Sequence, residues 1–164
     1  MKSPMRVLCI LGLGAGMTTI DAARPARADG HCQKVSGAIA ASITTAGCAS
    51  PVGLCTAGEF TGDGLLNGTT AFVADGLAVA AGMPVVVPPS TLSYSGHLTI
   101  TTKKGTLTLI DTGIFDTAAG RFSSLDEEAG GTGPFAGATA RLFIYGTGTS
   151  DFESKVTGEV CLAG

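Results

Sequence analysis

The sequence contains no tryptophan, only two tyrosines and only two histidines. An outer-membrane barrel carries girdles of aromatic residues at both membrane interfaces, so this shortage disfavours that class. With His31 and His97 as the only histidines, no Ser-His-Asp arrangement can be built, which disfavours a hydrolase. No close pair of cysteines or histidines has the spacing of zinc ligands, so we expect no metal site, and no motif calls for a cofactor.

Basic residues are also scarce. The chain has ten lysines and arginines against thirteen acidic residues, and the lysines are scattered. Nucleic acids and anionic lipids are bound by clustered positive charge, so we expect neither as a partner.

The first residues follow the pattern of a secretory signal peptide. Lys2 and Arg6 precede an apolar run from Val7 to Ile20, and the small-residue site Ala26-Arg27-Ala28 comes next. The apolar run has 14 residues, whereas a helix that crosses a bilayer needs about 20. We therefore predict a cleaved signal peptide and no membrane anchor.

Cleavage after Ala28 divides the chain into a signal peptide, 1–28, and one domain, 29–164. The mature part carries six basic and twelve acidic residues. Its length suits a single compact domain with a hydrophobic core. We expect a bacterial protein that is secreted or periplasmic and has no membrane span after processing.

Four cysteines remain after processing: Cys32, Cys48, Cys55 and Cys161. An even number of cysteines in an exported chain indicates two disulfides. Of the three possible pairings we favour Cys48 with Cys55, which closes a small loop, and Cys32 with Cys161, which joins the two ends of the domain.

Apolar residues after position 29 alternate with small or polar ones, and glycine and threonine are frequent. This period of two is typical of strands, and no persuasive helical period is present. The segment 80–90 contains three prolines and is predicted to be a surface loop or lid. The pattern predicts eight strands, over 34–44, 52–60, 65–78, 92–102, 106–114, 121–128, 138–147 and 152–162.

Eight short antiparallel strands must close or stack in order to hide their edges. A bond between Cys32 and Cys161 would place the first strand beside the last, which favours a closed barrel. An eight-stranded barrel is just wide enough inside to be filled by side chains or to hold one small ligand. The prediction is an all-β, single eight-stranded antiparallel barrel, with a β-sandwich as the alternative.

The stretch from Gly130 to Thr139 reads GGTGPFAGAT. Its four glycines permit positive φ and close backbone approach, so the chain can double back while Phe135 fills the end of the barrel. A phosphate-binding loop would need a strand before it and a helix after it, whereas a strand follows here.

This stretch and the strand 141–146 resemble the G-G-T-G-x-F-x-G-A-T turn-and-strand of bacterial secreted proteins in the allene oxide cyclase barrel-like group. Pro134 departs slightly from that pattern. The segments 112–117 and 157–162 are also similar to parts of the group, and the resemblance covers roughly 65–162.

The resemblance implies a small antiparallel barrel that often forms dimers or trimers. In the plant cyclases of this group the cavity steers the ring closure of an unstable epoxide, and in the more distant dirigent proteins it orients radical coupling. The catalytic residues of the cyclases do not align with positions here, so none is transferred.

Two carboxylates are candidates for catalysis. Asp111 shares a strand face with Leu107 and Leu109, and an acid inside an apolar barrel would have a raised pKa. The favoured interpretation nevertheless places Asp111 near a rim, bonded to Thr112 or to a backbone amide. The run 126–128 is interpreted as a solvated strand end, with Glu127 as the second candidate if it faces inward.

Three further residues are candidates for ligand binding: Arg141, Tyr145 and Tyr94. In the strand 138–147, Arg141 and Tyr145 lie on the face opposite the aliphatic residues. If the aliphatic face points inward, the aromatic residues Phe143 and Tyr145 are displayed outside and favour a subunit interface. If the faces are reversed, Arg141 and Tyr145 line the cavity.

Two classes of function remain open. The first is an exported barrel that binds a small apolar molecule and steers its cyclisation by confinement. The second is a structural or assembly module whose barrel is filled with side chains. We favour ligand binding and expect a homo-oligomer, either a dimer or a trimer.

Overall fold

The computed structural model describes residues 31–80 and 88–163. The predicted signal peptide and most of the predicted loop 80–90 therefore lie outside the described residues. In the described part no helix is long and apolar enough to cross a membrane.

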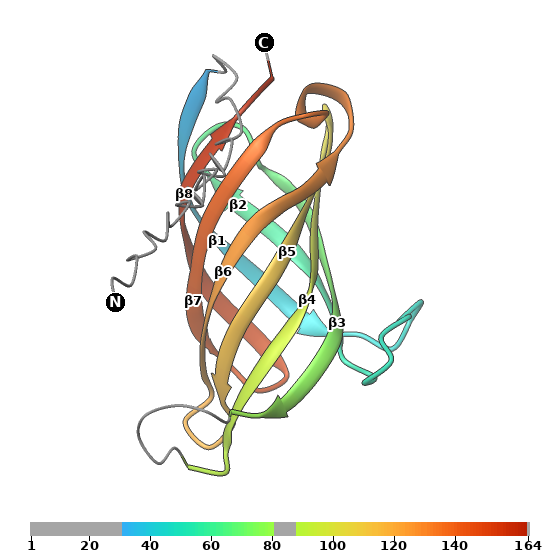
Figure 1. The fold of residues 1–164 in the computed structure, drawn as a ribbon, viewed down its shortest axis with the longest axis vertical. Coiled ribbons are helices and arrows are strands. Elements are labelled where there is room, and N and C mark those ends of the chain that lie inside the picture. Colours follow the sequence, from blue (N-terminus) through green and yellow to red (C-terminus); the bar gives the residue numbers. More distant parts are fainter. Residues whose placement is uncertain (1–30, 81–87, 164) are drawn as a thin grey trace, which may run out of the picture.

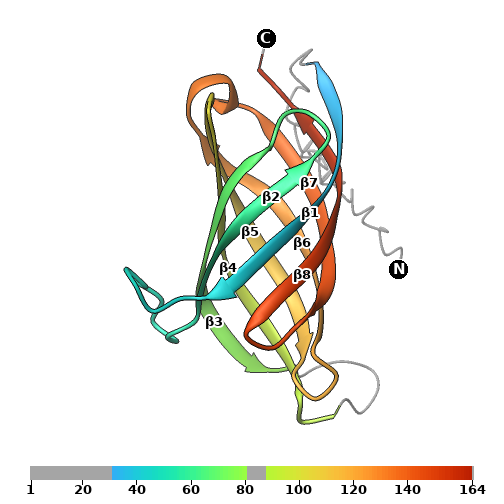
Figure 2. The ribbon, with the colours of Figure 1, turned by 180° about the vertical axis from the view of Figure 1, so that it is seen from behind.

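Eight antiparallel strands form a closed barrel in which every strand pairs with its neighbours in the chain, and the last pairs with the first (Figures 1 and 2). The predicted barrel is thus confirmed, and the alternative of a β-sandwich is wrong. The strands are β1 (Cys32–Ile43), β2 (Cys55–Gly62), β3 (Gly68–Val79), β4 (Thr91–Thr102), β5 (Gly105–Asp116), β6 (Arg121–Gly131), β7 (Thr139–Gly148) and β8 (Asp151–Cys161).

Three strand boundaries differ from the prediction by three residues and the others by fewer; one of the three is the start of β3, which lies at Gly68 and not at residue 65. β2 begins at Cys55, because residues 48–54 form a separate loop. β6 runs on to Gly131, so the first two glycines of the glycine-rich stretch belong to the strand. A short 3₁₀ helix, η1 (Gly133–Phe135), makes the turn into β7.

Closure of the barrel depends on the β1–β8 ladder. The register runs from Cys32 opposite Cys161 to Ser42 opposite Asp151. The Cys32–Cys161 disulfide joins the two strands at the first pair of this ladder. A bond between the ends of the domain therefore fixes the first strand beside the last, as predicted.

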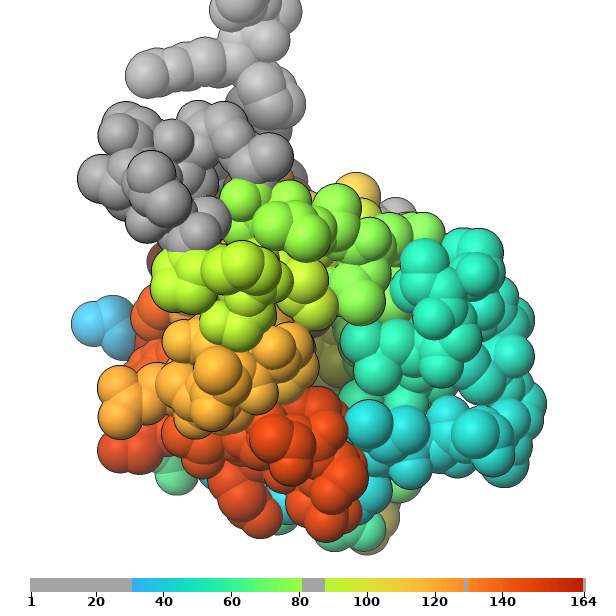
Figure 3. Space-filling view, turned by 90° about the horizontal axis from the view of Figure 1, so that it is seen from below, coloured from blue at the N-terminus to red at the C-terminus, as the bar shows by residue number. Residues whose placement is uncertain are grey.

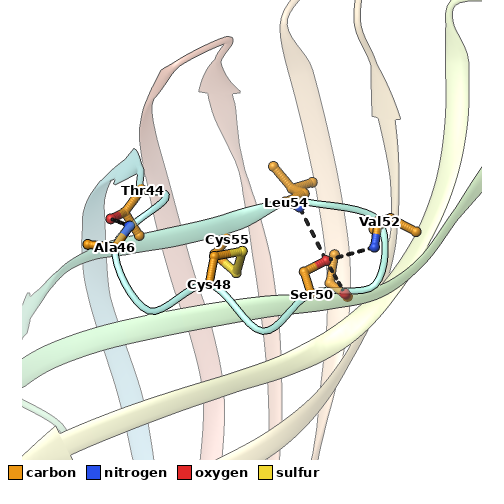
Figure 4. Close-up of a disulfide and its surroundings, with 8 residues drawn as sticks. Thr44, Ala46, Cys48, Ser50, Val52, Leu54 and Cys55 are labelled. Carbon is orange, nitrogen blue, oxygen red and sulfur yellow. Dashed lines mark hydrogen bonds between the residues drawn. A yellow bond between two sulfur atoms is a disulfide. The ribbon is translucent and has the colours of Figure 1, made fainter.

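The second predicted disulfide, Cys48–Cys55, is also present and braces the loop before β2 (Figure 4). Within this loop the Ser50 hydroxyl donates to the Ala74 carbonyl over 2.6 Å and accepts the N–H groups of Val52 and Leu54. The loop is thereby attached to β3.

One end of the barrel is filled with side chains. Phe135 of η1 is fully buried there, as predicted for the glycine-rich turn. Gly133 has a φ of 60°, which a larger residue rarely adopts, whereas Gly131 has ordinary φ and instead lies against the Phe135 backbone. The other fully buried large apolar residues are Phe60, Leu66, Ile100, Leu107, Leu109, Leu142, Val156 and Val160.

Candidate functional site

The opposite end of the barrel contains a cavity of about 310 Å³. Figure 3 looks onto this end, and the surface is hollowed near its centre, between the surrounding segments. The volume lies at the lower end of the range for small-molecule sites. The aliphatic and polar lining residues are Ile39, Ala41, Ile43, Leu54, Thr56, Leu77, Leu92, Leu98, Asp111, Thr117, Ser124, Ile144, Thr149 and Ser154.

Aromatic rings supply much of the remaining wall. The Phe72 and Tyr94 rings meet edge to face with centroids 5.9 Å apart. The Phe152 ring makes similar contacts with Phe122 at 5.8 Å and with Phe115 at 6.2 Å. All five rings line the cavity, so its wall is apolar and aromatic over several strands.

Two buried acids form the polar part of the site. Asp111 of β5 and Asp126 of β6 are directly opposite each other in the ladder and are 7% and 0% exposed. The Ser124 hydroxyl donates to Asp126 Oδ1 over 2.8 Å. Among the described residues, neither Asp111 Oδ1 nor Asp126 Oδ2 has a hydrogen-bond partner. Because Asp111 lines the cavity and Asp126 does not, Asp111 is the acid that a molecule in the cavity would meet.

Burial changes the protonation of these groups. It raises the pKa of Asp111 to about 7, a shift that Ser124 partly offsets. Burial, followed by the negative charge of Asp111, raises the pKa of Asp126 to about 8. Burial and the Asp111 charge also raise the pKa of Tyr94, so its phenol stays protonated. Near neutral pH the two acids therefore hold at least one proton between them and can donate or accept one.

Glycines on the inner face make room for the rings. A Cβ atom at Gly113 would lie 2.5 Å from Cζ of Tyr94, and one at Gly96 would lie 2.6 Å from the Phe72 ring. Since real Cβ contacts are not this close, both rings occupy space that a side chain would otherwise fill.

The structure brings together only two of the five predicted catalytic and ligand-binding residues. Asp111 and Tyr94 both line the cavity. The interpretation of Asp111 as a rim residue is wrong, because it is buried and faces inward. His97, three residues after Tyr94 on β4, lies exposed on the outside, with Nδ1 2.8 Å from Asp75 Oδ2.

Arg141, Glu127 and Tyr145 lie on the outer face and do not line the cavity. The Arg141 and Glu127 side chains are more than half exposed, with Nε and Oε1 3.6 Å apart. Tyr145 is 41% exposed and stacks on Phe143 with centroids 5.4 Å apart. The aliphatic face of β7 therefore points inward, which excludes the reversed orientation that would have placed Arg141 and Tyr145 in the cavity.

Asp126, Ser124 and four of the aromatic residues line or adjoin the cavity but are not predicted from the sequence. The interpretation of 126–128 as a solvated strand end is wrong at Asp126, which is fully buried. The alternation of Phe122, Ser124 and Asp126 along β6 is the signal that could have placed all three on one face.

Within the described ranges no cluster of three or more histidine, cysteine or acidic side chains could hold a metal ion. Comparison with known proteins finds no family model, no curated protein and no solved structure that matches the chain.

Proposed function

We propose that this protein binds a small, largely apolar molecule in the cavity at the open end of the barrel. The observation that carries the proposal is the combination, in one cavity, of an apolar aromatic wall with the inward-facing acid Asp111 and its buried neighbour Asp126. Small-molecule sites commonly join such walls to a few placed polar groups that orient the ligand.

We also propose that the protein is exported and that it is related to the allene oxide cyclase barrel-like group. Two disulfides are typical of an oxidising compartment outside the cytoplasm. The closed eight-stranded barrel is compatible with the resemblance to the allene oxide cyclase barrel-like group. We propose that a bound substrate would be held in a folded conformation, which lowers the barrier to cyclisation by confinement.

The test is equilibrium dialysis of the mature protein, with its disulfides intact, against 2-ethylnaphthalene. The unmodified protein should retain the hydrocarbon. Ala41→Phe places a ring in the cavity and should abolish retention, because Ala41 lines it. Ala40→Phe is the matched control, since Ala40 is the preceding residue of β1 and is exposed. Equal retention by both variants would contradict the proposal.

Assembly is the second candidate function. Apolar side chains are exposed on the outer face of β5, β6 and β7, with Leu125 directly opposite Phe143 in the ladder. We name this surface the outer strip, and it consists of Ile110, Ile114, Leu125, Phe143 and Tyr145. Exposed apolar patches of this kind favour contacts between proteins, and we propose self-association into a dimer or trimer through it.

A further inference from the structure

The charged groups that face the cavity are all acidic. Every lysine, arginine and histidine in 31–80 and 88–163 is exposed, and none lines the cavity. Among the residues that the structure describes, Asp111 and Asp126 therefore have no positive partner inside the barrel. A buried negative charge without a partner is strongly unfavourable, so the site is electrostatically suited to a cation.

The aromatic wall favours the same class of ligand. The faces of aromatic rings carry partial negative charge and attract ammonium groups, and the attraction is stronger where water is excluded. The cavity presents the rings of Phe72, Phe115, Phe122 and Phe152 together with the protonated phenol of Tyr94. A neutral apolar site would need the rings but not the two acids.

We propose that the ligand of this cavity is an apolar amine, bound as its ammonium ion against Asp111, with Asp126 behind it. This inference rests on the proposed function and names its ligand class. An ammonium group has up to three N–H donors and no acceptor, and Asp111 Oδ1 is a buried acceptor without a partner. A carboxylate ligand would be repelled by the acid pair.

Binding of a cation should displace the proton that the acids hold. The titratable groups at the site are Tyr94 from β4, Asp111 from β5 and Asp126 from β6, and Glu128 occupies the next alternate position of β6. An ammonium ion stabilises the ionised acids, so amine binding releases protons and tightens as the pH rises. A neutral hydrogen-bond acceptor would need a protonated acid and would show the opposite trend.

The experiment compares 2-(2-naphthyl)ethylamine with 2-(2-naphthyl)ethanol by isothermal titration calorimetry. We expect the amine to bind at least about tenfold more tightly than the alcohol near pH 8, with the difference shrinking below about pH 6 as the acids become protonated. Asp111→Asn should remove most of the difference. Glu127→Gln, a change of an exposed acid on the outer face of β6, should retain it.

A second measurement needs no variant. Titrations near neutral pH in two buffers of different ionisation enthalpy should show net proton release with the amine and none with the alcohol. Equal affinities for amine and alcohol, or no difference in proton release between them, would overturn the inference. If the protein still retains 2-ethylnaphthalene, the proposed function stands. Failure of 2-ethylnaphthalene to bind would overturn the proposed function itself.

Discussion

Tyr94 can lie against β5 because residue 113 has no side chain. The phenol occupies the place that a Cβ atom would take at Gly113, and its ring contacts the ring of Phe72 on the neighbouring strand β3. The wall of the cavity is therefore set by small residues as much as by large ones.

Gly113→Ala should destabilise the barrel by about 1 to 3 kcal/mol, because the added methyl group overlaps the Tyr94 ring and the Ser123 carbonyl oxygen. Gly130→Ala is the matched control: nothing lies within 4 Å of the added atom, and its free energy of unfolding should stay within about 0.5 kcal/mol of the parent. Urea denaturation measures both. An equal loss of stability in the two variants would contradict the close packing of Tyr94 and the Ser123 carbonyl against Gly113.

The acid pair makes stability depend on pH. The folded barrel raises the pKa of Asp111 from 3.8 to about 7 and that of Asp126 from 3.8 to about 8. Between these pH values the folded state holds protons that the unfolded chain has released. The contribution of the two acids to the free energy of unfolding is therefore greatest below about pH 4 and falls as the pH rises towards about 8.

The free energy of unfolding should fall by at most about 1.4 kcal/mol per pH unit for each proton that only the folded state binds. The Asp111→Asn, Asp126→Asn double variant should lose this slope, and urea denaturation from about pH 5 to about pH 8 measures it. A parent protein whose stability rises across that interval in parallel with the double variant would contradict a pair with raised pKa values.

The acid pair was only half predictable from the sequence. Asp111 follows two leucines at alternate positions, so its inward face can be predicted. In β6 the polar residues lie inside and the apolar residue outside: Ser124 and Asp126 face inward, whereas Leu125 is 36% exposed. Since the inner face of the barrel is partly polar around this cavity, an alternation rule that places apolar residues inside puts Asp126 in the solvent.

The strands and the Cys48–Cys55 disulfide could be predicted because their signals are local, and the Cys32–Cys161 disulfide because the remaining two cysteines lie near the two ends of the domain. Alternation and turn residues define each strand, and cysteines near the two ends of a domain suit a closed barrel. Which face of β7 points inward could not be decided locally, because both faces of the strand carry apolar residues. Burial of Leu142 and Ile144 decides it.

The two disulfides should differ in their contribution to stability. Cys32 and Cys161 are 129 residues apart and Cys48 and Cys55 are 7 apart. The chain-entropy model gives about 5 kcal/mol for the long closure and about 2.5 kcal/mol for the short one. Thermal unfolding of the two double cysteine-to-alanine variants should rank them in this order, and the reverse order would contradict a barrel whose ends are held chiefly by the long bond.

The outer strip predicts self-association. Phe143→Ser with Tyr145→Ser removes two exposed apolar side chains and should shift the protein towards the monomer in analytical ultracentrifugation. Thr139→Ser with Thr147→Ser, at exposed positions of the same strand, is the control and should assemble like the parent. If the first variant assembles just as the parent does, the strip is not the interface.

At the scale of the whole molecule, the barrel is divided into two halves with different interiors. Phe135 and the buried aliphatic residues fill the end that carries η1, whereas the other end is hollow and contains the acids. The sequence could predict a barrel of this width but not its cavity, because packing depends on how side chains from eight strands meet. The filled half provides a rigid base for the hollow half.

Binding of an apolar molecule in the hollow half can be measured from the methyl spectrum of the protein with and without 2-ethylnaphthalene. NMR with isotopically labelled methyl groups separates the two surfaces. We expect shifts at Ile39, Leu98 and Ile144, which line the cavity, and none at Ile110 and Ile114, which are exposed on the outer strip. Shifts confined to the outer strip would show that the hydrocarbon binds outside the barrel and not in its cavity.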